Sequence, residues 1–144
     1  MGTRSLTYIL DEYNSAQTEG AFVRDNIICM YRQYDGYLIG HGIELAEFLQ
    51  DFTVVNGYNT LTPARSANGM SCLAAQLVAH FKDGIRNIYI YPTNTSDVGE
   101  EFIYIISLIN NQLNIEVRDV WGDKIIFNGT PAELIEKINT KEYA

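Results

Sequence analysis

The stretch 101–118, EFIYIISLINNQLNIEVR, decides the fold expected for this chain. Its first half is dense in Ile and Tyr, and after the pair Asn110-Asn111 apolar and polar residues alternate one by one. Alternation with a period of two places side chains on opposite faces of a β-strand. Because Asn favours the backbone conformations of a tight turn between antiparallel strands, the stretch predicts a β-hairpin.

Further segments predict strands that would extend this hairpin into a sheet. They are residues 4–10, 26–34, 87–91 and 124–128, which are short and rich in residues that favour strands. We expect residues 87–91 to form a third antiparallel strand together with the two strands of the hairpin. The polar segment 11–20 predicts an exposed loop, and residues 53–67, with several small polar residues, predict an irregular excursion.

Other segments show the spacing of amphipathic helices. Residues 43–52 repeat apolar side chains three or four positions apart, with acidic residues between them. A second helix is expected to begin near Asn68 or Ser71 and to stop at Gly84. The run Thr130-Pro131-Ala132-Glu133 predicts the start of a third helix, because Thr caps the helix and Glu sits three residues after the cap.

The predicted order of elements, ββααββββα, indicates an α+β fold. Hairpins rather than regular strand–helix–strand crossovers favour a mainly antiparallel sheet of about six strands, with the three helices on one face. The chain has 144 residues, of which 47% are hydrophobic, so it is long enough to bury a core of its own. We therefore expect a single domain spanning residues 1–144.

The charge of the chain limits its partners. The formal net charge is -8 at pH 7, and the ten Lys and Arg residues are scattered singly. Binding to a long nucleic acid or to an anionic membrane surface needs clustered cations, so we expect neither partner. A small anion held by one or two arginines remains compatible with this composition.

Familiar metal and cofactor motifs are absent from the sequence. Cys29 and Cys72 lie in apolar runs without CxxC or Cys/His spacing, so both predict buried thiols. Neither a zinc-protease, a phosphate-loop nor a serine-hydrolase motif occurs, and we expect no metal and no cofactor. The acidic group at 97–101 could hold a divalent cation, but such runs are usually solvated loops. Because no apolar run approaches the roughly 20 residues of a membrane span, we expect a soluble, cytoplasmic protein.

The stretch 31–42, YRQYDGYLIGHG, carries the chemistry expected at a binding site. It reads as the end of a strand, a turn, a glycine-rich loop and the start of a helix. Arg32 could hold phosphate or carboxylate through its planar guanidinium, with Gln33 on the same rim and Arg4 on the neighbouring strand. The alternative is a structural arginine that pairs with Asp35 or with a nearby glutamate.

The glycine-rich end of this stretch offers further groups. His41 could act as a general base or contact a ligand, and the alternative is an exposed or helix-start histidine. Backbone N–H groups at Gly40 and Gly42 would add donors for an anion at the helix start. Asp35 is a turn former first and a candidate acid or base second.

Tyrosines give the stretch an aromatic surface. Tyr31, Tyr34 and Tyr37 could stack on a base or another ring, and Tyr34 and Tyr37 are the two assigned to the ligand. The alternative is that they bridge core and surface, as expected for several of the ten tyrosines in the chain. His80 lies beside an apolar helical stripe and is expected at the edge of the core.

Several of these motifs together resemble a known group of proteins. They are MGTR at 1–4, YRQYDGY at 31–37, GHG at 40–42, and NG at 68–69 leading to CLAAQL at 72–77. Over most of its length the chain resembles a family of small uncharacterised proteins of bacteriophages and bacteria. The resemblance implies no established activity. A phage origin would favour counter-defence, in which small acidic viral proteins bind a nuclease, a signalling enzyme or its nucleotide messenger.

Three functions are compatible with the sequence. The first is non-catalytic capture of a small, nucleotide-like anion, with Arg4 and Arg32 on its phosphate. The second is a metal-independent nucleotide-processing enzyme, with His41 or Asp35 as acid or base. The third is an acidic inhibitor that docks on a basic host protein, such as a defence protein. A tyrosine-rich antiparallel sheet also favours a homodimer, and a phage protein would work in the cytoplasm of its host.

Overall fold

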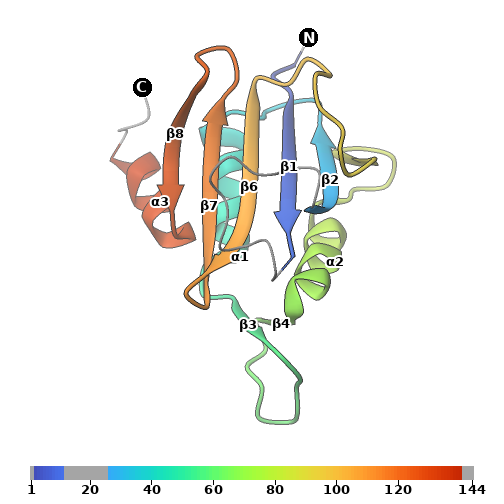
Figure 1. Cartoon of the computed structure of the whole chain (residues 1–144), viewed down its shortest axis with the longest axis vertical. Coiled ribbons are helices and arrows are strands. Elements are labelled where there is room, and N and C mark those ends of the chain that lie inside the picture. Colours follow the sequence, from blue (N-terminus) through green and yellow to red (C-terminus); the bar gives the residue numbers. More distant parts are fainter. Residues whose placement is uncertain (1, 12–25, 141–144) are drawn as a thin grey trace.

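A six-stranded sheet forms the centre of the fold in the computed structural model, which describes residues 2–11 and 26–140 (Figure 1). Its strands are β1 (Ser5–Leu10), β2 (Asn26–Arg32), β5 (Ile88–Tyr91), β6 (Phe102–Ile109), β7 (Gln112–Asp119) and β8 (Lys124–Gly129). The helices are α1 (Ile43–Leu49), α2 (Gly69–Phe81) and α3 (Pro131–Asn139). Of the predicted loop at 11–20, all but Asp11 lies outside the described residues.

The strand order across the sheet is β5-β2-β1-β6-β7-β8. Every neighbouring pair is antiparallel except β1 with β6, which run parallel. The predicted hairpin is confirmed as β6–β7, and Asn110 and Asn111 take positive φ values of 51° and 65° at its turn. The α+β fold with a mainly antiparallel sheet is therefore confirmed.

The position expected for β5 is wrong. This strand does not join the hairpin but pairs with β2 at the far edge of the sheet, and β1 lies beside β6 instead. All six residues of β1 are buried, as a central strand requires, whereas the middle residues of β5, Tyr89 and Ile90, are exposed. A strand that is apolar on both faces gains most by lying in the middle, and the more exposed β5 suits an edge.

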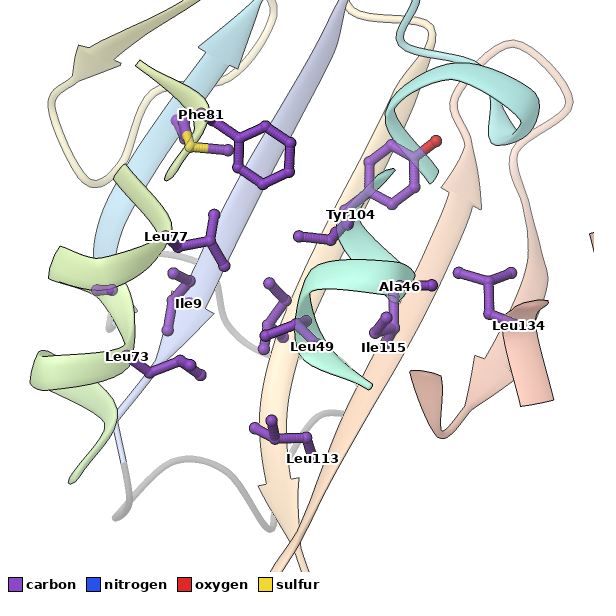
Figure 2. Packing of buried hydrophobic residues seen from close by; sticks show 14 of the residues in the cluster. Ile9, Ala46, Leu49, Leu73, Leu77, Phe81, Tyr104, Leu113, Ile115 and Leu134 are labelled. Atoms are coloured by element: carbon purple, nitrogen blue, oxygen red, sulfur yellow. The ribbon is translucent and has the colours of Figure 1, made fainter. Parts of the chain in front are cut away.

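All three helices contribute to one apolar core on a single face of the sheet, called here the helix face. Figure 2 shows Ala46 and Leu49 of α1 between Leu73, Leu77 and Phe81 of α2 on one side and Leu134 of α3 on the other. Strand residues such as Ile9, Tyr104 and Ile115 complete this core. A second cluster lies on the opposite face and consists of Leu6, Tyr8, Leu10, Cys29, Tyr31 and Ile105.

The predicted helices are present, with changed ends. Residues Leu38–Gly42 form a π-helical turn that runs directly into α1, and α1 ends at Leu49, three residues before the predicted end. The helix α3 begins as predicted. The Oγ1 atom of Thr130 accepts from the backbone N–H of Glu133 at 3.2 Å, and Oε1 of Glu133 accepts from the backbone N–H of Thr130 at 2.8 Å.

The excursion at 53–67 also contains regular structure. The short strands β3 (Thr53–Val55) and β4 (Ser66–Asn68) pair in parallel as a separate two-stranded sheet. Cys29 is buried as expected, and Cys72 is half-buried; both thiols are free. Within the described ranges, no helix combines the length and the apolar character needed to cross a membrane.

Candidate functional site

Arg32 ends strand β2 and points to the helix face; the residue is 7% exposed, and several groups hold its guanidinium. Its Nε donates to the carbonyl oxygen of Tyr34 at 2.9 Å. Its Nη1 lies 2.7 Å from Oε1 of Glu44 and 3.1 Å from Nδ1 of His41. The structural alternative of a pairing with a nearby glutamate is thus present. Among the hydrogen bonds of the described residues, those of Arg32 use Nε and Nη1 and not Nη2.

His41 lies in the core, with no exposed surface. Its ring packs between Phe81 and Tyr104, with centroid distances of 5.2 Å and 5.0 Å. Because a guanidinium can only donate, Nδ1 accepts from Arg32, and the ring proton on Nε2 is therefore donated to Oγ1 of Thr7, 2.9 Å away. Burial, helped by the positive charge of Arg32, lowers the pKa of His41 to about 3, so the ring is neutral near pH 7.

These contacts do not support the roles predicted for the GHG segment. Both nitrogens of His41 are already bonded and its ring is enclosed, so it cannot reach a ligand as acid, base or donor without opening the core. The N–H groups of Gly40 and Gly42 donate to the carbonyl oxygen of Tyr37 at 3.0 Å and 3.3 Å. Sequence reasoning expected a free helix start here, but the π-helical turn satisfies these donors.

Arg4 does not join Arg32. Its Nη1 donates to the carbonyl oxygen of Val98 at 3.0 Å, and Val98 packs against the cluster on the opposite face of the sheet. Burial raises the pKa of Tyr31 in that same cluster, and the nearby charge of Arg4 opposes the rise. The structure therefore places the two arginines on different faces, and one small ligand cannot bridge them.

A cavity of about 300 Å³ lies where β2 ends and β5 begins, and we call it the β2–β5 cavity. It brings together four of the predicted residues, Arg32, Gln33, Tyr34 and Asp35. The loop between α2 and β5 completes it with Asp83, Arg86 and Asn87, and Tyr89 of β5 adds a ring. Sequence reasoning missed these four residues, because only the pairing of Arg32 with Ile88 brings the loop beside β2.

The β2–β5 cavity combines charges of both signs with aromatic rings. Arg86 is exposed and takes no part in the ion pairs found among the described residues. Oδ1 of Asp35 accepts from the Tyr37 hydroxyl at 2.9 Å, and this bond raises the pKa of Tyr37. Tyr34 and Tyr89 are 59% and 42% exposed, and Nζ of Lys82 lies over the Tyr89 ring, 4.5 Å from its centre.

Tyr37 itself lies outside the β2–β5 cavity. Its ring lines a separate apolar hollow of about 220 Å³ with Leu38, Ile39, Phe102 and Ile126. Of the three tyrosines that could stack on a ligand, only Tyr34 therefore lines the cavity, and Tyr31 is buried in the cluster on the opposite face. Tyr37 reaches the cavity only through its hydroxyl bond to Asp35.

The acidic group at 97–101 stabilises its own loop. The carboxylate of Glu100 is buried and accepts from the backbone N–H groups of Asp97 at 3.1 Å and Val98 at 2.8 Å. Over the ranges that the structure covers, no group of three or more His, Cys, Asp or Glu side chains is arranged to hold a metal ion. Comparisons of the chain with protein-family models, curated proteins and solved structures found no match.

Proposed function

We propose that this protein captures a small, nucleotide-like anion in the β2–β5 cavity. The observation that carries the proposal is that two arginines, Arg32 and Arg86, line one cavity of about 300 Å³. The exposed guanidinium of Arg86 can hold phosphate through two parallel hydrogen bonds, whereas Arg32, whose Nε and Nη1 are already bonded, offers its charge and its Nη2. Since Arg32 is fixed by Glu44, His41 and Tyr34, little side-chain freedom is lost when a ligand binds to it.

The carboxylates of the cavity favour a nucleotide over a simple anion. Asp35 and Asp83 would repel a ligand that carried negative charge alone. A nucleotide also carries a base whose amino groups donate hydrogen bonds, and these would suit the two carboxylates. Tyr34 and Tyr89 supply exposed rings for stacking, which contributes about 1–3 kcal/mol per base. The volume lies at the lower end of the roughly 300–1,000 Å³ of small-molecule sites and fits a mononucleotide.

Capture is favoured over turnover. The enzymatic alternative assigned acid–base chemistry to His41 or Asp35, but His41 is enclosed in the core, which leaves Asp35 as the one of the two at the cavity. An acid–base group has to reach the atom whose proton it moves. In a phage, capture of a signalling nucleotide without turnover would counter a host defence that depends on that messenger.

Isothermal titration with linear and cyclic nucleotides tests the proposal. We expect Arg86→Ala to weaken the binding of the best nucleotide about tenfold or more, because a hydrogen bond to a charged group contributes about 1.5–3 kcal/mol. Arg86 is exposed, so the fold should persist. Lys124→Ala is the matched control, since it removes one exposed charge from β8 at the other edge of the sheet. Equal losses in both variants, or no binding by any nucleotide, would refute the proposal.

A further inference from the structure

A second cavity, of about 450 Å³, adjoins the first at Asn87, which lines both. We call it the α1–α2 cavity, because one wall is the exposed side of α1, with Glu44, Glu47 and Phe48. The other wall is the C-terminal end of α2, with His80 and Phe81. The Arg32–Glu44 pair separates the two cavities, since Arg32 lines the first and Glu44 lines the second.

The polar groups of the α1–α2 cavity favour positive charge. Glu47 is exposed and takes no part in the ion pairs of the described residues, and only Oε1 of Glu44 is used by Arg32. The last carbonyl groups of α2, a helix of 13 residues, add the negative end of the helix dipole beside the same cavity. Because Arg32 offsets the charge of Glu44, the negative potential comes mainly from Glu47 and from the end of α2.

The one cation in the wall of this cavity, Arg65, is already engaged. Its Nη2 donates to the carbonyl oxygens of Phe48 and Gln50. Its guanidinium carbon lies 5.2 Å from the ring centre of Phe52 and 6.0 Å from that of Phe48. Arg65 is thus held beside the rings of Phe48 and Phe52, and its contacts show that a guanidinium group can lie against these two rings.

The aromatic part of the cavity is a stacked pair. The exposed His80 ring lies on the Phe48 ring, with the centroids 4.4 Å apart and the planes 28° from parallel. Phe81 meets His80 edge-on at 4.9 Å. His80 was expected at the edge of the core, and the structure places it on the surface of this cavity. A flat ligand could lie against this pair while its charged end reaches Glu47.

We propose that the α1–α2 cavity binds a small organic cation with a planar amidinium or guanidinium head and a flat body. Glu47 and the unused oxygen of Glu44 receive the head, and the His80–Phe48 pair receives the body. This site is separate from the proposed nucleotide site, because it selects the opposite charge and uses other side chains. Either proposal can fail without the other.

Benzamidine is the probe for this site, and benzamide, a neutral molecule of nearly the same shape, is its matched control. In ¹⁵N–¹H spectra we expect benzamidine to shift the backbone signals of Glu47, Phe48 and His80. Benzamide should bind at least about tenfold more weakly, because it lacks the charge-assisted bonds. Equal binding of the two molecules, shifts confined to other parts of the chain, or no binding of benzamidine would overturn the proposal.

Single substitutions then test whether Glu47 binds the charged head of benzamidine. We expect Glu47→Gln to weaken benzamidine binding about tenfold. Glu136→Gln, which makes the same change at an exposed position on α3, should leave binding unchanged. Arg86→Ala should also leave it unchanged, which separates this site from the nucleotide site. An equal effect of Glu47→Gln and Glu136→Gln would mean that only the overall charge matters, and this result would also overturn the proposal.

Discussion

Arg32 and His41 share a hydrogen bond of 3.1 Å between Nη1 and Nδ1, which holds a charged guanidinium against a neutral, buried ring. Thr7 lies behind this pair in the core, and Glu44 lies in front of it at the surface. The four side chains form one continuous path of hydrogen bonds from β1 to α1. Because each member orients the next, the position of Arg32 in the β2–β5 cavity depends on residues that no ligand touches.

The first prediction concerns this buried ring. His41→Ala removes packing between Phe81 and Tyr104, and it removes the hydrogen-bond partner of Thr7 Oγ1 and one of the partners of Arg32. We expect the free energy of unfolding to fall by about 3–5 kcal/mol, as for other large-to-small core substitutions. Urea denaturation followed by circular dichroism measures the change.

The other histidine of the chain is the matched control. His80 is exposed, and its ring packs on Phe48 without enclosure, so His80→Ala should cost about 1 kcal/mol or less. Similar losses in the two variants would show that His41 is not enclosed as described.

The second prediction concerns pH. The pKa of His41 is lowered to about 3 in the folded protein, against about 6.5 in an unfolded chain, so the unfolded state binds more protons between these values. The contribution of His41 to stability is therefore complete above about pH 6.5 and is lost as the pH falls toward about 3. We expect a slope of up to about 1.4 kcal/mol per pH unit from this group below pH 6.

Denaturation curves between pH 7.5 and pH 5 separate His41 from the carboxylates, which titrate mainly at lower pH. The variant His41→Gln keeps a polar side chain but cannot titrate, so its stability should vary less across this range. A wild-type curve as flat as that of the variant would contradict the burial of a neutral ring.

The third prediction concerns Gly40. A Cβ atom at this position would collide with the carbonyl oxygen of Asp35, which is backbone and cannot rotate away. We expect Gly40→Ala to lower the free energy of unfolding by about 1–3 kcal/mol, because the π-helical turn must shift to relieve the clash. Thermal unfolding followed by circular dichroism measures the loss.

Gly122→Ala is the control for this substitution. Its added Cβ would mainly meet the end of the Asp119 side chain, 2.9 Å away, and that side chain can move. We expect a loss of less than about 1 kcal/mol. If the two variants were equally stable, the result would contradict the close approach of Gly40 to the carbonyl oxygen of Asp35.

The sequence predicted those parts of the fold whose signals are local. The turn at Asn110-Asn111 and the cap at Thr130 each depend on a few adjacent residues, and both form as expected. The place of β5 in the sheet depends instead on which distant strand it pairs with. The periodicity of its residues does not identify that partner. The order of the strands in the sheet could therefore not be predicted from the sequence pattern.

The candidate site divides in the same way. Arg32, Gln33, Tyr34 and Asp35 are neighbours in the sequence and remain together around one cavity. His41, between two glycines, has the local appearance of an exposed loop residue. Its partners Thr7, Phe81 and Tyr104 come from three distant elements, so its burial could not be predicted from its neighbours. Arg86 was missed for the related reason that its loop joins the site only through strand pairing.

The parallel pairing of β1 with β6 determines when this sheet can be completed. The pair joins Ser5, near the start of the chain, to Phe102, and it links β5, β2 and β1 to β6, β7 and β8. Contacts between residues so distant in sequence form slowly, because the intervening chain must first be brought together. During synthesis the edge of β1 that pairs with β6 therefore stays open until residues 102–109 have been made, and an open strand edge can pair with another chain.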